Sequence, residues 1–313
     1  MLEIRSVSRS FGELRVLDDV SFDVRPGRMT GFIGANGAGK TTTMRIILGV
    51  LAAHGGQVTW DGAPVTQPVR QRFGYMPEER GLYPKMRVAD QIAYFGRLHG
   101  LDTSTARRNT AELLDQLELT ARARDPLETL SLGNQQRAQI AAALVHDPDL
   151  LILDEPFSGL DPIAVEVVLG VLRERAARGV PVLFSSHQLE VVERLCDDVV
   201  VISAGSIAAG GSRTELRSRF ATPRFELIVD SDAGWVRDVP RVRIVELDGA
   251  RVVFDIESSD GTHGAGSDPS GADGAHVPGP DQDVLDQAVR RGRVHRFAPV
   301  TPSLAEIFKE VVS

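Results

Sequence analysis

Residues 34–41 read Gly-Ala-Asn-Gly-Ala-Gly-Lys-Thr and fit the pattern G-x-x-x-x-G-K-[ST]. The short apolar run Met29–Ile33 precedes this stretch, and Thr42–Leu51 follows it with apolar residues at helical spacing. A glycine loop between a strand and a helix presents backbone N–H groups at a helix N-terminus, where they bind anions. The sequence therefore predicts a phosphate-binding loop whose backbone wraps closely around a nucleotide.

The side chains of this loop are expected to make further contacts with ATP. We expect Lys40 to contact the β- and γ-phosphates and the hydroxyl of Thr41 to bind Mg²⁺. Only three of the 35 basic residues are lysines, and one of them stands in this loop. A compact ammonium fits among phosphate oxygens where a planar guanidinium is too bulky. The nucleotide ligands predicted in this loop are Gly34, Asn36, Gly37, Ala38, Gly39, Lys40, Thr41 and Thr42.

A second motif, Leu130-Ser131-Leu132-Gly133-Asn134-Gln135-Gln136, follows about ninety residues later. It resembles the signature loop that defines the ATP-binding-cassette (ABC) family. Because the phosphate loop and this motif occur together and in this order, the chain is identified as a member of the ABC ATPases by resemblance. The resemblance implies an α/β fold of the P-loop NTPase class, in which a mostly parallel sheet carries a helical insertion.

The segment Leu150-Leu151-Ile152-Leu153-Asp154-Glu155 resembles the Walker B strand of the family. Its four apolar residues predict a strand that is buried on both faces, as in the middle of a parallel sheet. By resemblance, Asp154 holds Mg²⁺, directly or through water, and Glu155 polarises the attacking water. The opposing interpretation is that the two acids merely end a strand in solvent.

Two more residues match the nucleotide site of the family. His187 follows the predicted strand Val182–Ser185 and resembles the switch histidine, which hydrogen-bonds the γ-phosphate and holds the water in line. Phe11 matches the aromatic residue that stacks on adenine, a contact worth about 1 kcal/mol. Taken alone, the histidine is more often structural and the phenylalanine equally fits a core position. The predicted catalytic residues are thus Lys40, Glu155 and His187.

The resemblance also implies that two chains complete each site. In ABC ATPases the signature loop contacts the nucleotide of a partner subunit, so Ser131, Gly133 and Asn134 are expected to bind ATP held by a second copy. Ser131 would donate its hydroxyl next to the N-terminus of the helix behind it. The segment Ser158-Gly159-Leu160-Asp161 resembles the D-loop of the same interface. One chain carries one copy of each motif, so a closed homodimer with two ATPs is expected.

The chain departs from the commonest family pattern at three places. Leu132 replaces a glycine and Asn134 a glutamine of L-S-G-G-Q, a variant associated with exporter-type ATPases. Glu78 stands where the family usually has a glutamine that touches Mg²⁺ and links to the membrane partner, so the predicted metal ligands are Thr41, Asp154 and Glu78. At 4 Å and an effective dielectric constant of 20, a carboxylate and a phosphate charge repel by ~4 kcal/mol. Whether Glu78 faces the metal or turns away stays open at this point.

The pattern of apolar residues divides the chain into an ABC ATPase domain, residues 1–220, and a small α+β accessory domain, residues 221–313. Within the first domain, strands are predicted at Leu2–Val7 and Val20–Val24. A helical subdomain is predicted at about 86–146, with helices at Val88–Leu98, Thr105–Leu119 and Gln135–Val145, and a further helix is predicted at Pro162–Arg178. In the accessory domain we predict strands at Phe225–Val229, Val242–Leu247 and Ala250–Ile256 and helices at Asp283–Arg290 and Ser303–Val312. Residues 258–282, rich in Gly, Ser, Asp and Pro and without Lys or Arg, are expected to form a mobile acidic loop.

Composition limits the class of protein and its compartment. No apolar run approaches the ~20 residues that cross a bilayer, and the N-terminus lacks the layout of a secretion signal. The single cysteine, Cys196, agrees with a reducing compartment and is expected to be an inert packing residue. We therefore expect a cytoplasmic protein that lies peripherally on the inner face of the cell membrane and binds separate permease subunits. The net charge of −8 argues against nucleic acid as a partner.

The leading hypothesis is the ATPase subunit of an ABC transporter. The tail, with Phe297-Ala298-Pro299 and Leu304-Ala305-Glu306-Ile307-Phe308, resembles the C-terminal extension of bacterial drug- or sodium-efflux ATPases, which favours export. The segment Arg80-Gly81-Leu82-Tyr83-Pro84 is expected to dock on the membrane subunit. One alternative is a soluble ABC ATPase that acts on ribosomes or DNA, although such chains usually carry two cassettes or long coiled coils. Another alternative is that the tail is a regulatory ligand-binding module.

Overall fold

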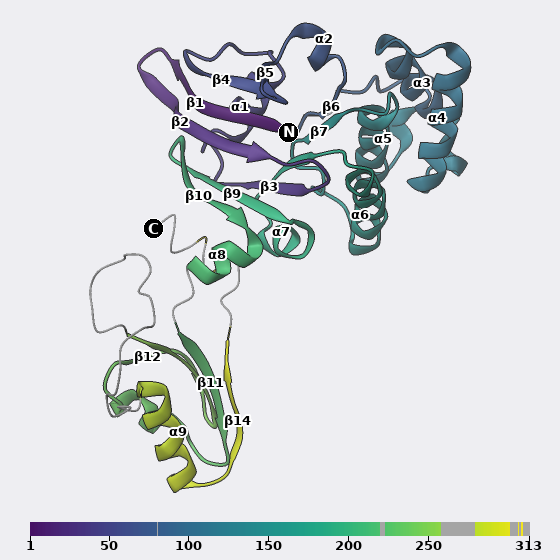
Figure 1. Ribbon diagram of the computed structural model, residues 1–313. Helices are drawn as coiled ribbons and strands as arrows, with labels where there is room; N and C mark the ends of the chain where they lie inside the picture. The colour runs from purple at the N-terminus through teal and green to yellow at the C-terminus, as the bar shows by residue number, and fades with distance from the viewer. Residues whose placement is uncertain (80, 220–222, 258–278, 301–305, 307, 309–313) are drawn as a thin grey trace. The chain divides into compact units, whose positions relative to one another are not determined.

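The computed structural model describes residues 1–79, 81–219, 223–257, 279–300, 306 and 308. The chain divides into two compact units, Met1–Leu216 and Arg217–Ile307 (Figure 1). Among the described residues, no helix is both long and apolar enough to cross a membrane.

The first unit is built on a sheet with the strand order β10-β9-β3-β8-β7-β6. Strands β9, β3, β8, β7 and β6 are parallel, and β10 turns back antiparallel to β9. In β3, β7 and β8 every residue is buried, as expected for central parallel strands. The bounds are β3 Met29–Ile33, β6 Phe73–Met76, β7 Leu150–Leu153, β8 Val182–Ser186, β9 Asp198–Ser203 and β10 Ser206–Ser212.

The direction of the parallel strands decides where the site forms. Because the carboxyl ends of β3, β6, β7 and β8 lie at one edge of the sheet, the segments that follow them meet there. These segments contain the glycine loop, Glu78, Asp154 and His187. The pairing of β6 with β7 was not predicted, and it brings Glu78 to the same edge as Asp154.

A second, antiparallel sheet has the order β2-β1-β4-β5, with β1 Leu2–Phe11, β2 Leu14–Val24, β4 Gly55–Trp60 and β5 Ala63–Pro64. The first two strands are longer than the predicted Leu2–Val7 and Val20–Val24. Polar residues and register shifts interrupt their apolar alternation, which hides the extra length in the sequence. A tight turn with Gly12 at φ +58° joins them and places Phe11 at the tip of a hairpin.

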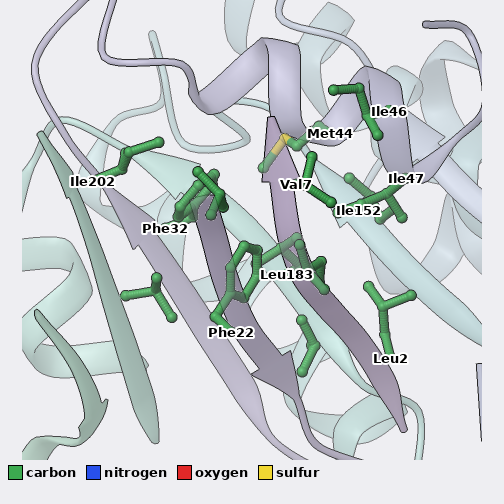
Figure 2. Packing of buried hydrophobic residues seen from close by; sticks show 14 of the residues in the cluster. Leu2, Val7, Phe22, Phe32, Met44, Ile46, Ile47, Ile152, Leu183 and Ile202 are labelled. Atoms are coloured by element: carbon green, nitrogen blue, oxygen red, sulfur yellow. The ribbon is translucent and has the colours of Figure 1, made fainter. Parts of the chain in front are cut away.

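The main core of this unit lies between the two sheets and the helix α1, Lys40–Ile47 (Figure 2). Phe32 of the parallel sheet meets Phe22 of the antiparallel sheet, with ring centroids 5.1 Å apart. Met44 and Ile47 of α1 are fully buried against them. On the other face of β3, a side chain at Gly31 would lie 2.6 Å from Sγ of Cys196, so this glycine permits close packing of α7, Leu189–Leu195. Cys196 is buried and free, and burial raises its pKa, which agrees with the predicted role in packing.

The helical insertion contains α3, α4 and α5, which lie side by side in Figure 1. Helix α3 has the predicted bounds, whereas α4 begins two residues before the prediction because Asp102 caps it through its carboxylate. Helix α5 begins three residues earlier than predicted, since Ser131 is its N-cap. Gly133 and Asn134 therefore lie in the first turn of a helix and not in a loop. The bounds are α3 Val88–Leu98, α4 Thr103–Gln116, η1 Thr120–Arg122, η2 Leu127–Thr129 and α5 Leu132–Leu144.

The other helices of the first unit are α2 Gln67–Arg70, α6 Pro162–Ala177, α7 and α8 Arg213–Arg219. Asp161 caps α6 by accepting a hydrogen bond of 2.8 Å from the Ala164 N–H. The predicted helix Pro162–Arg178 is thus confirmed to within one residue.

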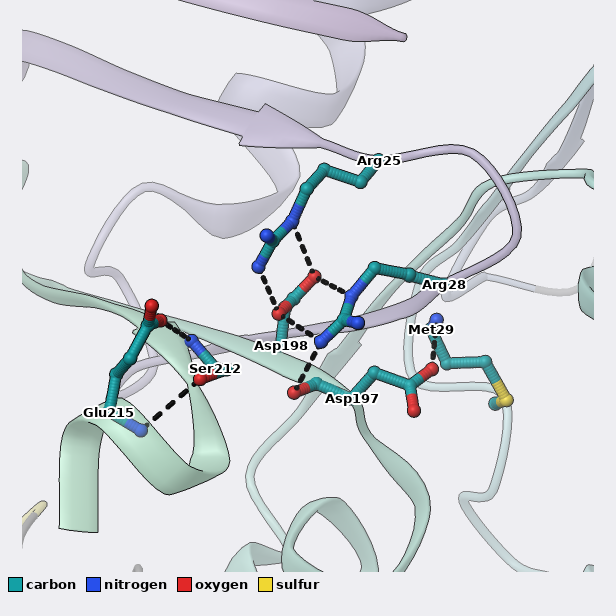
Figure 3. Close-up of polar contacts among 7 residues, drawn as sticks. All are labelled: Arg25, Arg28, Met29, Asp197, Asp198, Ser212 and Glu215. Carbon is teal, nitrogen blue, oxygen red and sulfur yellow. Dashed lines mark hydrogen bonds and ion pairs between the residues drawn. The ribbon is translucent and has the colours of Figure 1, made fainter. Parts of the chain in front are cut away.

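A buried carboxylate fastens β9 to the turn between β2 and β3 (Figure 3). Asp198 is 5% exposed and accepts hydrogen bonds from both Arg25 and Arg28. The Arg28 Nε lies 2.6 Å and the Arg25 Nη2 2.5 Å from its oxygens. Burial alone would raise the pKa of Asp198, and the bonds from the two guanidiniums outweigh burial and lower it.

The second unit is a sheet with the order β12-β13-β11-β14, packed against α9. Its core gathers Leu227 and Phe254 from the sheet, Val236 from η3, and Val284 and Ala288 from α9. The bounds are β11 Arg224–Val229, η3 Gly234–Asp238, β12 Val242–Asp248, β13 Arg251–Ile256, α9 Pro280–Arg291 and β14 Val294–Pro299.

The structure of this unit differs from the predictions at β14 and at the start of α9. Strand β14 was missed because Val294-His295-Arg296 is too polar to resemble a strand. Residues 280–282, predicted as loop, form the start of α9, and the rest of the predicted acidic loop, 258–278, lies outside the described residues. The predicted helix Ser303–Val312 also lies outside them, apart from Glu306 and Phe308.

Candidate functional site

The glycine loop connects β3 to α1 and uses two left-handed glycines. Gly37 has φ +81° and Gly39 has φ +111°, values that a residue with a side chain rarely adopts. A side chain at Gly39 would also lie 2.5 Å from Cδ2 of Leu17. Glycine is therefore required at position 39, both for the backbone angle and for the approach of β2.

Lys40 is the first residue of α1, and its side chain folds back over the loop. Its ammonium donates hydrogen bonds to the carbonyl oxygens of Gly34 at 2.7 Å and Ala35 at 3.2 Å. The residue is only 7% exposed. A buried ammonium at a helix N-terminus has its charge directed at the concave side of the loop, which is suited to an anion.

Asp154 follows β7 and is 1% exposed. Its Oδ1 accepts a hydrogen bond of 2.5 Å from the hydroxyl of Ser185, whereas the buried Oδ2 has no partner among the described residues. A buried carboxylate oxygen without a partner is costly unless a cation or donor meets it. Burial and the negative charge of Asp154 also raise the pKa of the neighbouring Tyr75.

Glu155 has an unusual backbone that is fixed from two sides. Its φ is +52°, and its N–H donates a hydrogen bond of 2.8 Å to the Ser185 hydroxyl. Its carbonyl accepts a bond of 3.1 Å from the side-chain amide of Gln136. Non-glycine residues in the left-handed region cost free energy and persist only where neighbours hold them. The side chain of Glu155 is thereby aimed at His187, whose Nδ1 lies 2.9 Å from its Oε2.

These residues surround one pocket of about 520 Å³. It brings together residues that are far apart in the sequence and includes Leu14 and Val16, which were not predicted. Gly34, Ala38 and His187 do not line it directly, although Gly34 and His187 contact residues that do. The lining residues are Phe11, Leu14, Val16, Asn36, Gly37, Gly39, Lys40, Thr41, Thr42, Glu78, Asp154 and Glu155.

The hairpin tip and Glu78 both line the pocket. Phe11 is 46% exposed, and the guanidinium carbon of Arg9 lies 4.8 Å from its ring centroid. An exposed aromatic ring is not a core residue, so the core interpretation of Phe11 is wrong. Glu78 is exposed and is one of the residues that line the pocket.

The chemistry of the donors fits Mg²⁺. Mg²⁺ prefers one or two carboxylates together with hydroxyl, water and phosphate oxygens. The pocket offers the unpartnered Oδ2 of Asp154, the hydroxyl of Thr41 and the carboxylate of Glu78. Across the described residues, histidine, cysteine and acidic side chains do not gather in threes at metal-binding distance. A cation here would therefore depend on nucleotide oxygens as well as on protein.

The signature residues lie outside this pocket. The Ser131 hydroxyl accepts a long hydrogen bond of 3.4 Å from the Asn134 N–H, and Asn134 accepts one of 2.5 Å from Arg137. Leu132, in the place of a family glycine, is 57% exposed. In a single chain, Ser131, Gly133 and Asn134 thus face no nucleotide pocket of their own.

Three polar residues that hold the site were missed in the sequence. Ser185 hydrogen-bonds the side chain of Asp154 and the backbone of Glu155, and Gln136 and Gln139 on α5 donate to backbone carbonyls of the segments that follow β7 and β6. All three are at most 6% exposed. A polar residue within an apolar strand or on the buried face of a helix is a weak signal for such a role, because buried polar groups need partners.

A parallel sheet that ends in a glycine loop and buried acids, with a helical insertion, defines the class of ABC ATPase cassettes. The chain matches the ABC transporter family over residues 17–158. It is 35% identical over 312 residues to the uncharacterized ABC transporter ATP-binding protein YhaQ of Bacillus subtilis (strain 168), covering 100% of this chain and 98% of that protein. The chain therefore belongs to the ABC transporter ATP-binding proteins.

Other relatives match about 70% of the chain. The linearmycin resistance ATP-binding protein LnrL of Bacillus subtilis (strain 168) is 36% identical over 220 residues, or 70% of this chain and 71% of that protein. A Nod factor export ATP-binding protein I of Paraburkholderia xenovorans (strain LB400) is 38% identical over 218 residues, or 69% and 72%. A solved ATP-binding subunit of an ABC transporter has a TM-score of 0.66 at 33% identity and covers 70% of this chain and 93% of its own.

Proposed function

We propose that this chain hydrolyses ATP as the nucleotide-binding subunit of an ABC transporter that exports its substrate. The observation that carries the proposal is the buried Glu155, held in a left-handed backbone and hydrogen-bonded to His187 beside the glycine loop. A carboxylate oriented in this way acts as a general base toward a water molecule. His187 orients the carboxylate and extends toward the terminal phosphate.

The other residues of the pocket bind and neutralise the nucleotide. The N–H groups of the glycine loop and the ammonium of Lys40 bind the phosphates. Thr41, Asp154 and Glu78 hold Mg²⁺, which balances charge on the phosphate oxygens when it is bound. The exposed ring of Phe11 offers a face to adenine, and Leu14 beside it, 67% exposed, offers more apolar surface.

The proposal includes a homodimer in which each ATP lies between two chains. The support is that Ser131, Gly133 and Asn134 stand away from the pocket of their own chain, at the start of a helix suited to an anion. A dimeric bacterial ABC transporter cassette, MJ0796, shares the fold with a TM-score of 0.63 at 22% identity, over 68% of this chain and 98% of that one. ATP binding then closes the dimer, and hydrolysis opens it.

Separate permease subunits are the proposed membrane partners, with this chain on the cytoplasmic face. The candidate binding surface for a permease subunit lies on the helical insertion. There Tyr83 and Tyr94 are 54% and 38% exposed, and their ring centroids lie 6.4 Å apart. A neighbouring groove of about 520 Å³ between α3 and α4 is lined partly by Ala89, Ala93 and Ala111. Small side chains beside exposed aromatic ones suit an inserted helix of a partner. Arg80, also expected at this surface, lies outside the described residues.

Export is supported by the names of two relatives, a linearmycin resistance protein and a Nod factor export protein. The competing function, an ATPase acting on ribosomes or DNA, is disfavoured by the net charge of −8. The accessory unit, residues 221–313 in the proposed division, is an interaction domain in this account.

Affinity purification of the tagged chain from detergent-solubilised membranes tests the transporter assignment. A polytopic membrane protein should co-purify with the wild type and be lost from a Tyr83→Ala/Tyr94→Ala variant. An exposed control, Arg108→Ala on α4, should retain it. Recovery of ribosomal proteins or DNA in place of a membrane subunit would contradict the proposal.

A further inference from the structure

Helix α5 carries two buried glutamines, Gln136 and Gln139, three residues apart on one face. They are 6% and 4% exposed. Residues at this spacing are neighbours along one side of a helix. Each side-chain amide donates hydrogen bonds to two backbone carbonyls, and the two glutamines bond different loops. Helix α5 is therefore hydrogen-bonded to both loops.

Gln139 holds the backbone on both sides of Glu78. Its Nε2 donates to the carbonyl of Pro77 at 2.7 Å and to that of Glu79 at 3.3 Å. Glu78 itself follows the end of β6 and lines the nucleotide pocket. The two bonds therefore fix the segment that directs the Glu78 carboxylate.

Gln136 holds the backbone at Glu155 in the same way that Gln139 holds the backbone around Glu78. Its Nε2 donates to the carbonyls of Glu155 and Pro156, each at 3.1 Å. The same helix begins directly after Ser131, which caps it. One rigid element thus connects the signature serine, the backbone of Glu155 and the backbone around Glu78.

We propose that Gln139 is a positioning residue that fixes the backbone on both sides of Glu78 and thereby sets the direction of the Glu78 carboxylate. The inference rests on the proposed function, in which Glu78 meets Mg²⁺ and Ser131 meets the nucleotide of a second copy. A glutamine suits the task because its amide offers two N–H donors without a charge. A lysine there would add a positive charge next to the metal ligands.

The test replaces Gln139 by a side chain of similar length without donors, Gln139→Met. A matched control, Gln116→Leu, removes a partly buried amide on α4 that bonds Glu174 and touches neither loop. Hydrogen exchange is measured first, on the nucleotide- and metal-free protein. The peptide that contains Glu78 and Glu79 should exchange about 10-fold faster in Gln139→Met than in wild type or control.

The second readout is the Mg²⁺ concentration that gives half-maximal ATPase activity. Residues that orient a metal ligand typically change metal affinity by about 10-fold or more, so this concentration should rise about 10-fold in Gln139→Met and stay unchanged in Gln116→Leu. In a Glu78→Gln background the further shift should be less than about 2-fold, because the effect passes through Glu78.

The outcomes separate this proposal from the proposed function. Unchanged exchange in Gln139→Met, or equal change in the control, overturns the positioning role whether or not the wild type hydrolyses ATP. Faster exchange with an unchanged Mg²⁺ requirement, or an equal Mg²⁺ shift with and without Glu78, overturns it as well. A wild type without ATPase activity would instead refute the proposed function, and the exchange measurement would still decide on the contact.

Discussion

Nδ1 of His187 lies 2.9 Å from Oε2 of Glu155, so the segments that follow strands β8 and β7 are joined by a side-chain contact next to the nucleotide pocket. The contact is between a half-exposed imidazole and a carboxylate that is nearly buried. Ser185, two residues before His187, bonds both the side chain of Asp154 and the backbone of Glu155. Strand β8 therefore orients the candidate base and the candidate metal ligand together.

Glu155→Gln keeps the size of the side chain and removes its capacity to accept a proton. We expect ATP turnover to fall by about 10²–10⁴ while MgATP binding persists. Steady-state phosphate release and calorimetric titration measure the two effects separately. Glu118→Gln, at an exposed position, serves as control, and unchanged hydrolysis in Glu155→Gln would remove this residue from the chemistry.

Lys40→Ala removes the ammonium that lies over the glycine loop. Because Lys40 is the only lysine among the described residues that line the pocket, nucleotide binding should be lost in calorimetry. Lys85→Ala is the matched control, since Lys85 is an exposed lysine outside the pocket. Normal ATP affinity in a folded Lys40→Ala protein would contradict the assignment of the loop.

Asp198→Ala leaves the guanidiniums of Arg25 and Arg28 without their shared carboxylate (Figure 3). The unfolding free energy of the protein should fall by about 2 kcal/mol, less than for a fully buried pair because both arginines are partly exposed. Urea denaturation followed by circular dichroism measures it. Asp23→Ala, which breaks an exposed contact with Arg5, should change stability by less than about 0.5 kcal/mol. Equal effects of the two substitutions would refute the assigned role of Asp198.

His146 stacks on His99 with ring centroids 3.7 Å apart, at the junction of the helical insertion and β6. Burial, and then the neighbouring His99, lower the pKa of His146 from the ordinary 6.5 to about 4. A lowered pKa in the folded state means that the unfolded chain binds the proton first as pH falls. The stabilising contribution is complete above pH 6.5 and declines between 6.5 and about 4.

Urea unfolding at pH 7 and pH 5 tests this dependence. The loss of stability on acidification should be smaller by about 1–2 kcal/mol in His146→Leu than in the wild type, since the variant has no group to protonate there. The substitution of an exposed histidine, His54→Leu, provides the comparison. An identical loss in wild type and His146→Leu would mean that His146 titrates normally.

The alternation of strand and helix and the glycine loop were sufficient to predict the α/β fold, because buried parallel strands such as Leu150–Leu153 have an unambiguous apolar sequence. Strands that contain polar as well as apolar residues were harder to predict. The extension of β1 to Phe11 passes through polar residues, and β14 contains two basic residues. In each case the strand forms because it pairs with neighbouring strands, and the local sequence pattern gives no information about that pairing.

In the candidate site, too, some residues were predictable from the sequence and others were not. Glycines, lysine and paired acids next to strand ends were identifiable, since the chemistry of phosphate binding restricts residue types. The residues that hold them were not identifiable, because a serine in β8 or a glutamine in α5 has many possible partners. Only the fold shows that Ser185 meets Asp154 and that Gln139 meets Pro77 and Glu79.

In the proposed mechanism, two copies of the chain complete each ATP site. The most direct test measures ATPase activity per milligram while the protein is diluted through the range in which sedimentation shows dimers turning into monomers. We expect specific activity to rise steeply with protein concentration and to level off once dimers dominate. Constant, full activity in a solution that sedimentation shows to be monomeric would contradict the account.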